Sequence, residues 1–521
     1  MKRICTLLLA ASMLLGVATG ASAIDFKAKG QWLMGFAGGE NSLVNKYRAP
    51  GATSNTKQNS DDKFAAQQRV RLQLDAVASE SLSGTVFFEI GNQVWGQEKT
   101  GGALGADGNS VIKVKRAYID WMVPQTDLKF RMGIQGVTLP NKAGGSAIMD
   151  TDAAGITASY QFNENVGLTA LWARPANDNY VGGKDNANYL DNMDLFALMV
   201  PVKLDGFEIT PWAMYGMKGK NTLTTPFSTK DGDLNFTLYP YYGVYDRDNR
   251  TDVGNTSKAY GSMFWAGLPF AITAWDPLNI EVDINYGYVE AMGRYDAAKY
   301  NGADRIGKRG STERQGWLAK ALVEYKMDWG VPGIFGWYGS GDDGNVKNGS
   351  ERMPSIVPMG NFTSFLGDGN YGWMWVDNSL EYAGTWGLGL QIRDMSFLED
   401  LKHTFRVNYI GGTNSPSMAK KYLSADTVSG RGFGGAYMGA NSAQLGMDPL
   451  YMTTEDSALE IGLTNTYQMY ENFTIMLDAA YLATWLDHSK SVWGRSVMNG
   501  QGGSDQVRDP WNVNLSFVYA F

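Results

Sequence analysis

The end of the chain alternates in polarity. Residues 511–521 read WNVNLSFVYAF, so that large apolar side chains occupy every second position and smaller or polar ones lie between them. This period of two is typical of a β-strand with one apolar face. Such a strand would promote aggregation in water, whereas in an outer membrane lipid covers the apolar face and the first strand pairs with the free edge. The terminal strand therefore indicates a membrane β-barrel.

The same alternation recurs along the whole chain. In residues 69–76, RVRLQLDA, apolar side chains alternate with arginine, glutamine and aspartate. Residues 278–288 and 316–326 behave in the same way, and no apolar run after the N-terminal region is long enough for a membrane-spanning helix. The pattern predicts an all-β fold in which lipid faces one side of each strand and water the other.

The connections between these strands alternate in length. Short turns such as 79–81, 124–126 and 470–472 alternate with long polar stretches, which is typical of a barrel with short periplasmic turns and long extracellular loops. Nine long and eight short connections predict an antiparallel transmembrane barrel of about eighteen strands, with sixteen as the alternative count. Residues 195–202 and 261–272 are the least regular strands, because neither alternates cleanly.

The N-terminus has the features of an export signal. Lys2 and Arg3 precede an apolar stretch, and residues 21–23 read Ala-Ser-Ala, a small-residue cleavage site. We therefore expect a signal peptide at 1–23 and a single barrel domain at 24–521. Cys5, the only cysteine, lies in the signal, so disulfides and iron–sulfur clusters are not expected. Removing the signal changes the formal charge from −8 to −10, which argues against a nucleic-acid partner.

One segment resembles the trimeric general porins of bacterial outer membranes. Residues 116–135 read RAYIDWMVPQTDLKFRMGIQ and precede the third long loop, 136–153. In that family a similar strand–turn–strand unit precedes a loop that folds into the lumen and forms a constriction. The overall layout is also similar to the homotrimeric porins of anaerobic sulfur-metabolising bacteria. Ile134 replaces the family's arginine and the Pro-Glu-Phe-Gly-Gly motif is absent, so the resemblance implies the loop's role by position only.

Charged side chains on the polar faces of neighbouring strands are the candidate lining of the constriction. We expect a basic wall from Arg69, Arg71, Arg116, Lys129 and Arg131, with Asp120 among them. Asp150 and Asp152 of the third loop are expected to face this wall, so that a transverse field orients polar solutes. The alternative is that these charges are only solvated or paired with neighbours. Lys113 and Lys115 are expected near the outer rim, because they are out of phase with Arg116.

The sequence gives little support for catalysis or metal binding. His403 is expected at a periplasmic turn and His488 at the start of an outer loop, so the two histidines lie at opposite ends of the barrel. Acidic pairs such as Asp342 and Asp343 lack the spacing of a calcium-binding loop. We therefore expect no enzyme activity, no cofactor and no metal site.

These patterns predict an outer-membrane channel for passive diffusion of small hydrophilic solutes and ions. The alternatives are a substrate-specific porin for sugars or organic anions, and a surface adhesin or receptor with a closed lumen. Expected partners are the solutes, outer-membrane lipid and lipopolysaccharide, and the barrel assembly machinery; the resemblance adds a homotrimer. The C-terminal strand with Phe517, Tyr519 and Phe521 is the expected assembly signal.

Overall fold

A computed structural model describes most of the chain. It covers residues 24–40, 44–47, 56–57, 63–104, 112–177, 192–220, 222, 238, 258–298, 306–364, 382–418, 452–487, 506–507 and 509–521. The expected signal peptide, Cys5 and His488 lie outside the described residues.

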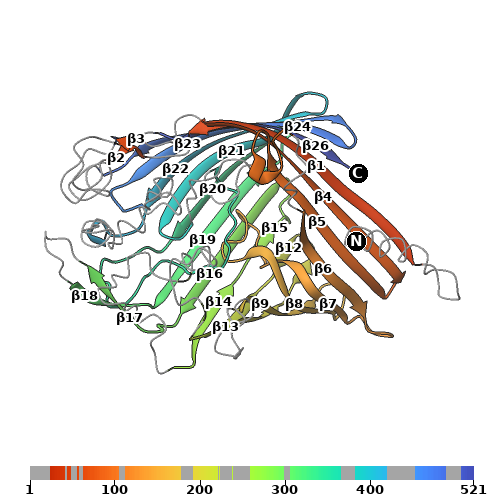
Figure 1. Ribbon diagram of the computed structural model, residues 1–521, viewed down its shortest axis with the longest axis horizontal. Helices are drawn as coiled ribbons and strands as arrows, with labels where there is room; N and C mark the ends of the chain where they lie inside the picture. Colours follow the sequence, from red (N-terminus) through yellow and green to blue (C-terminus); the bar gives the residue numbers. More distant parts are fainter. Residues whose placement is uncertain are drawn as a thin grey trace.

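The described chain forms one antiparallel sheet of eighteen wall-spanning strands (Figure 1). The spans are β1 (Asp25–Glu40), β4 (Lys63–Ser79), β5 (Leu82–Val94), β6 (Ile112–Met122), β7 (Lys129–Thr138), β8 (Asp150–Gln161), β9 (Gly167–Asn177), β10 (Asn192–Met199) with β11 (Val202–Leu204), β12 (Phe207–Ile209) with β13 (Trp212–Gly219), β14 (Tyr260–Gly267) with β15 (Phe270–Ile272), β16 (Leu278–Val289), β19 (Arg314–Tyr325), β20 (Val331–Gly339), β21 (Thr385–Leu398), β22 (Leu401–Gly412), β23 (Ser457–Tyr470), β24 (Phe473–Trp485) and β26 (Trp511–Ala520). The predicted count of about eighteen strands is confirmed.

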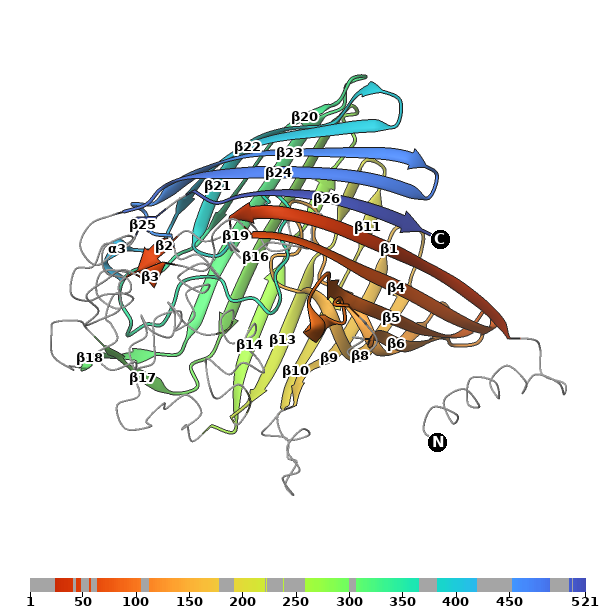
Figure 2. The same cartoon turned by 45° about the horizontal axis from the view of Figure 1, so that its top comes forward.

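The first and last strands close the sheet into a barrel. β1 pairs with β26 from Gln31 opposite Ala520 to Glu40 opposite Trp511, and the two strands lie side by side in Figure 2. Main-chain bonds between Gly30 and Phe521 extend this pairing to the last residue. Closure leaves neither β1 nor β26 as a free edge in the described part of the sheet, as a strand in lipid requires because nothing there can satisfy an open N–H or C=O group.

The described elements outside the wall are small. β17 (Arg294–Ala298) and β18 (Ile306–Ser311) form a hairpin, and β2 (Val44–Tyr47), β3 (Thr56–Lys57) and β25 (Gln506–Val507) form a minor sheet. The single-turn helices are η1 (Glu98–Thr100) and α3 (Pro416–Met418). Among the described residues, no helix has the length and apolar character needed to cross a membrane.

Proline interrupts three neighbouring spans. Pro201 lies between β10 and β11, Pro211 between β12 and β13, and Pro269 between β14 and β15. Proline has no N–H to donate to the ladder, but all three carbonyl groups still accept main-chain hydrogen bonds from adjacent strands. The interrupted segments therefore continue as single spans of the wall.

The outward surface of the wall is apolar. Side chains at alternate positions, such as Leu388 and Leu390 on β21 and Ile461 and Leu463 on β23, are 41–62% exposed. Exposing many large apolar groups to water would be costly, whereas hydrocarbon is a suitable environment for them. A closed barrel with this exterior is an outer-membrane β-barrel.

Part of the wall is apolar on its inner face as well. On β10, Phe196 and Leu198 are exposed outward, whereas Met193, Leu195 and Ala197 on the other face are buried. Inward residues of β9, β13, β14, β19 and β20 join the same buried cluster with apolar residues of two loops. This explains why residues 195–202 and 261–272 do not alternate cleanly, because both faces of the wall are covered by apolar material there.

Candidate solute pathway and constriction

The third loop, residues 139–149 between β7 and β8, reaches inward-facing side chains of distant strands. The main-chain N–H of Lys142 donates to Asp283 Oδ1 on β16 at 2.9 Å, and Lys142 Nζ forms an ion pair with Glu208 on β12. From β19, Lys320 Nζ donates to the carbonyl oxygens of Ala143, at 2.5 Å, and Gly145. The loop therefore folds into the lumen, as expected from its position in the sequence.

A buried ion pair holds the tip of this loop. Lys320 Nζ lies 2.9 Å from Asp283 Oδ2, and both side chains are at most 2% exposed. Two buried charges are tolerated only when they are paired and hydrogen-bonded, and the loop carbonyls supply the remaining partners of the ammonium group. The Tyr382 hydroxyl donates to the carbonyl of Gly144, and burial raises the pKa of Tyr382, so this hydroxyl stays protonated as a donor.

The wall divides where the third-loop hairpin leaves it. Pairing between β6 and β7 ends at Ala117 opposite Ile134, whereas β7 continues to pair with β8 up to Thr138 opposite Asp150. Arg116 of β6 crosses this division and donates from Nε to Asp152 Oδ1 of β8 at 2.6 Å. Its guanidinium packs against Gly136, where a Cβ atom would lie 2.8 Å from Arg116 Cζ.

Basic side chains outnumber carboxylates at this division. Lys115 Nζ lies 3.0 Å from Asp152 and 3.9 Å from Glu89. Arg71 Nε lies 2.9 Å from Glu89, and Arg69 reaches the same carboxylate at 3.9 Å. We call Arg69, Arg71, Glu89, Lys115, Arg116 and Asp152 the basic seam. Among the described residues, even without Arg69, three cations share two carboxylates there.

The two predicted loop acids lie elsewhere than expected. Asp150 and Asp152 begin β8 instead of lying in the loop between the strands. Asp152 touches the basic wall directly and does not face it across an aperture, because the hairpin packs against β6. Asp150 accepts a hydrogen bond from the Thr138 hydroxyl at 2.6 Å. The expected separation of opposed charges is therefore wrong at this point.

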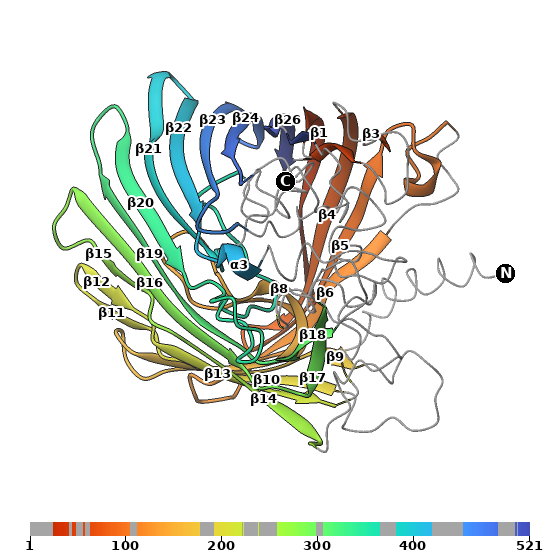
Figure 3. The ribbon, with the colours of Figure 1, turned by 90° about the vertical axis from the view of Figure 1, so that its left-hand side faces the viewer.

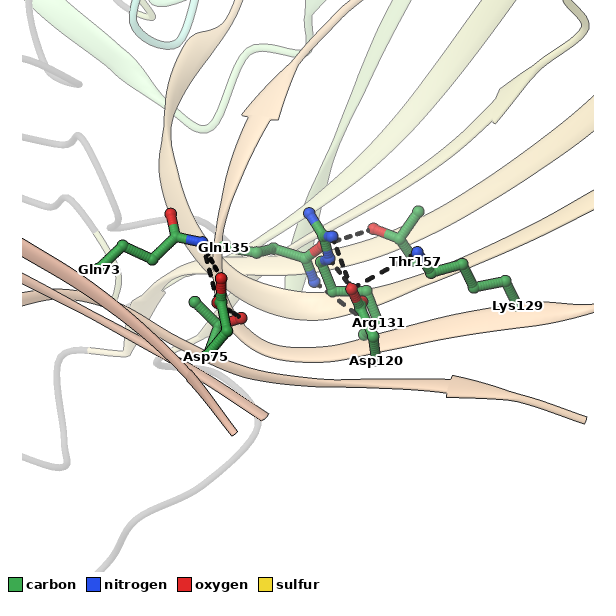
Figure 4. A network of polar contacts seen from close by, with 8 residues as sticks. Gln73, Asp75, Asp120, Lys129, Arg131, Gln135 and Thr157 are labelled. Atoms are coloured by element: carbon green, nitrogen blue, oxygen red, sulfur yellow. Dashed lines mark hydrogen bonds and ion pairs between the residues drawn. The ribbon is translucent and has the colours of Figure 1, made fainter. Parts of the chain in front are cut away.

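The remaining predicted residues, Asp120, Lys129 and Arg131, lie close to the short turn between β6 and β7, and Figure 4 shows them as one polar group. Arg131 of β7 binds Asp120 of β6 with both Nε and Nη2, at 2.7 and 2.8 Å, and Lys129 Nζ lies 3.5 Å from the same carboxylate. The Arg131 guanidinium also lies 4.2 Å from the centre of the Tyr118 ring. These charges are paired along one wall, as the alternative interpretation expected, and the structure does not bring them to the seam.

Sequence reasoning missed or misplaced three residues of the seam and the third loop, namely Glu89, Lys115 and Lys142. Glu89 lies directly opposite Arg71 in the strand register. Its position on the polar face of β5 could have been used to predict that it meets the arginines of β4. Lys115, expected near the rim, instead joins the seam, because a bulge between Phe87 and Phe88 shifts the register of β6 by one residue. Lys142 has no local signal, because its partners come from distant strands.

Among the described residues, two cavities beside the third loop stand out. The larger, about 880 Å³, extends under Lys142 and Gly144 to strands β16–β23. Its charged lining residues are Lys142, Glu281, Glu324, Arg393, Asp394, Lys402 and Arg406. The smaller, about 310 Å³, lies over β7–β10 and includes Lys129, Arg131 and Gln135. Polar and charged groups thus line the space left beside the loop.

The described residues contain no cluster of three or more metal-ligating side chains. Asp343 accepts a bond from the N–H of Asn345 at 2.6 Å, and Asp342 accepts one from the Ser350 hydroxyl at 2.5 Å, so these acids organise their own loop. His403 lies within β22 and not in a turn, and its Nδ1 is 2.6 Å from Asn465 Oδ1.

No family model matches the sequence, and no curated protein matches it. Among solved structures, the chain is similar to Pseudomonas aeruginosa OccK11 (OpdR), with 11% identity, a TM-score of 0.46, and coverage of 95% of this chain and 96% of that one. It is also similar to the P. aeruginosa outer membrane protein OprD, with 10% identity, a TM-score of 0.46, and 97% and 96% coverage. P. aeruginosa OpdK, solved with vanillate, matches at 10% identity and a TM-score of 0.45, with 95% and 98% coverage. The strand pairing of this chain itself, not this likeness, defines its fold.

Proposed function

We propose that this outer-membrane barrel is a passive channel for small hydrophilic solutes and that it favours anions. The observation that carries the proposal is the basic seam at the base of the third loop. Arg71, Lys115 and Arg116 share the carboxylates of Glu89 and Asp152, and lower on the wall Lys129 and Arg131 share Asp120. A lumen wall with such a local excess of positive charge attracts anions and repels cations.

The third loop supports a narrowed pathway. A barrel of about eighteen strands would otherwise enclose a space too wide for side chains to fill. The loop is fixed to β12, β16 and β19 through Glu208, Asp283 and Lys320, and under this proposal solutes pass beside the seam at its base. Charge at a constriction has more effect than charge in a wide vestibule, because low-dielectric walls concentrate the field.

The test is the reversal potential of purified protein in planar bilayers under a salt gradient. Arg71→Ala with Arg116→Ala removes two cations of the seam, and we expect the reversal potential to shift towards cation selectivity. The matched control, Arg71→Lys with Arg116→Lys, keeps both charges, and we expect it to retain the wild-type value. An alanine variant with the wild-type reversal potential would remove the seam from the pathway.

A substrate-specific channel for organic anions is the second candidate, and the cavity of about 880 Å³ favours it. Four cations and three carboxylates line that cavity, with Arg393 paired to Glu324 and Asp394, so the charged and polar ends of an organic anion would find donors at one place beside acceptors. Such a channel shows saturable block of ion current by its solute. A current that falls only in proportion to solute concentration would leave the general channel as the better description.

We also propose a homotrimer, which rests on the resemblance to trimeric porins, and export by a cleaved signal at 1–23, which rests on the pattern of the N-terminal sequence. Three-step closure of single insertion events would support the trimer. The C-terminal residues Phe517, Tyr519 and Phe521 are the proposed contact for the barrel assembly machinery. Deleting Phe521 should reduce insertion into the outer membrane.

A further inference from the structure

We infer that residues 350–364, in the connection between β20 and β21, are a second constriction element, and that Phe362 is the positioning residue that joins it to the third loop. This inference deepens the proposed channel function. If the inference holds, two interlocked loops set the size limit for solutes, and not the third loop alone.

Main-chain hydrogen bonds join the two loops. The N–H groups of Asn361, Met359 and Val357 donate to the carbonyls of Gly144, Ser146 and Ile148 at 3.1, 2.7 and 3.2 Å. Ile356 also donates to Ile148, and Asp150 donates back to Val357 at 2.9 Å. Five such bonds between segments more than two hundred residues apart give the loops one shared backbone arrangement.

Phe362 fills the space between the loops and the barrel wall. Phe362 is only 2% exposed. Its ring stacks on the rings of Phe335 and Trp337, two inward-facing residues of β20, with ring centres 4.6 and 6.2 Å apart. Tyr382 meets the same ring edge-on at 6.3 Å. Aromatic pairs in these geometries add to the stabilisation from burial, so the ring fixes the loops against one part of the wall.

The third loop is shaped to accept this ring. Gly144 and Gly145 have φ angles of 68° and 85°, the left-handed region that favours glycine. A Cβ atom on Gly144 would lie 2.7 Å from both the Phe362 ring and the Tyr382 hydroxyl, and one on Gly145 would lie 2.8 Å from the Met359 carbonyl oxygen. The two glycines therefore permit a close approach that other residues would prevent.

The other end of the second element is fixed to the wall. Arg314 of β19 is fully buried and donates to the carbonyls of Arg352 and Met353, each at 3.0 Å. Trp265 Nε1 of β14 donates to the carbonyl of Pro354 at 2.9 Å. Segment 350–354 is thus held on the wall, and only its continuation towards Phe362 lies on the third loop.

Both loops contribute to the roof of the larger cavity. Asn361, Phe362 and Ser364 line it beside Lys142 and Gly144, and the Ser364 N–H donates to Glu460 on β23 at 2.8 Å. The second element therefore reaches from the third loop to the opposite wall. Loss of the Phe362 ring would let the two loops separate and would widen the passage beside them.

The experiment measures single-channel conductance and the exclusion limit for neutral polymers in planar bilayers. For Phe362→Ala we expect higher conductance and a shift of the exclusion limit to larger polymers. Phe196→Ala is the control, because Phe196 is an exposed aromatic on the outward face of β10, and it should match wild type. If circular dichroism shows that Phe362→Ala does not fold, Phe362→Leu is measured instead, with a smaller shift expected in the same direction.

A second variant tests the joining of the loops independently of current. The only natural cysteine is Cys5, so Ser146→Cys with Met359→Cys should form one disulfide in the folded barrel, and that disulfide should suppress the effect of Phe362→Ala. Unchanged conductance and exclusion limit in Phe362→Ala would overturn the inference, and so would failure of the cysteine pair to cross-link. If the Ser146→Cys, Met359→Cys variant cross-links but the wild-type barrel conducts no ions, the proposed function is overturned and the joining of the loops is not.

Discussion

Arg116 of β6 and Asp152 of β8 join two strands that do not pair with each other. Arg116 Nε donates to Asp152 Oδ1 at 2.6 Å, beyond the last β6–β7 pair, Ala117 and Ile134. Asp152 Oδ2 also forms an ion pair with Lys115 Nζ at 3.0 Å. One carboxylate thus connects the base of the third-loop hairpin to the wall that it leaves, and it neutralises part of the seam's charge.

Replacing Asp152→Asn should make the channel more selective for anions. The change removes one negative charge beside Lys115 and Arg116, whose side chains are 29% and 39% exposed. Loss of an ion pair this exposed should change the free energy of unfolding by no more than about 1 kcal/mol. The reversal potential under a salt gradient is the measurement. Asp150→Asn is the control, because within the described residues Asp150 forms no ion pair with a basic side chain, and a shift of equal size in both variants would contradict a special role for the seam.

Replacing Lys320→Met should strongly destabilise the barrel. The change leaves Asp283 buried without its cation and removes two donors to the third loop. Breaking one partner of a buried pair typically costs about 3 to 5 kcal/mol. Urea unfolding followed by tryptophan fluorescence measures the loss. Lys402→Met is the control, because Lys402 is 62% exposed and 3.8 Å from Asp394, and similar losses in both variants would show that burial of the pair is not the cause.

The loop that contains Glu351 should loosen as the pH rises towards neutrality. Burial raises the pKa of Glu351 to about 7; the negative charges of Asp342 and Asp343 also raise it, whereas the hydrogen bond from the Asp343 N–H opposes the shift. The folded loop therefore holds this proton more tightly than the unfolded chain, so stability is lost as pH rises from the ordinary value of 4.5 to about 7. Amide hydrogen exchange of residues 340–353, corrected for the intrinsic pH dependence, should increase across this window.

Glu351→Gln should remove that dependence, because a glutamine does not titrate there. The side-chain carbonyl oxygen of the glutamine can still accept the hydrogen bond that the Asp343 N–H donates to Glu351 at 3.0 Å. Glu399→Gln, at an exposed position in the turn between β21 and β22, is the control and should exchange like wild type. An equally steep pH dependence in Glu351→Gln would assign the effect to another group.

The seam shows how far local pattern predicts a site. The alternation of β4 placed Arg69 and Arg71 on its polar face, and in the structure both arginines reach the carboxylate of Glu89. The same reasoning grouped Arg131 with them, although Arg131 pairs with Asp120 nearer the short turns. It also put Lys115 out of phase, because a bulge changes which side chains share a face without a clear mark in the sequence.

The sequence by itself determined the barrel: its strand number, the order of long and short connections, and the apolar exterior. These follow from a period of two and from turn composition, which are local properties of the chain. Only the tertiary structure decided which charges meet, which loops fill the lumen, and why β10 and β14 are apolar on both faces. Those features depend on contacts such as Lys320 with Ala143 and Phe362 with Phe335. These contacts form only when strand pairing and the bend of a hairpin bring distant segments together. The spacing of residues along the chain does not predict which distant segments will meet.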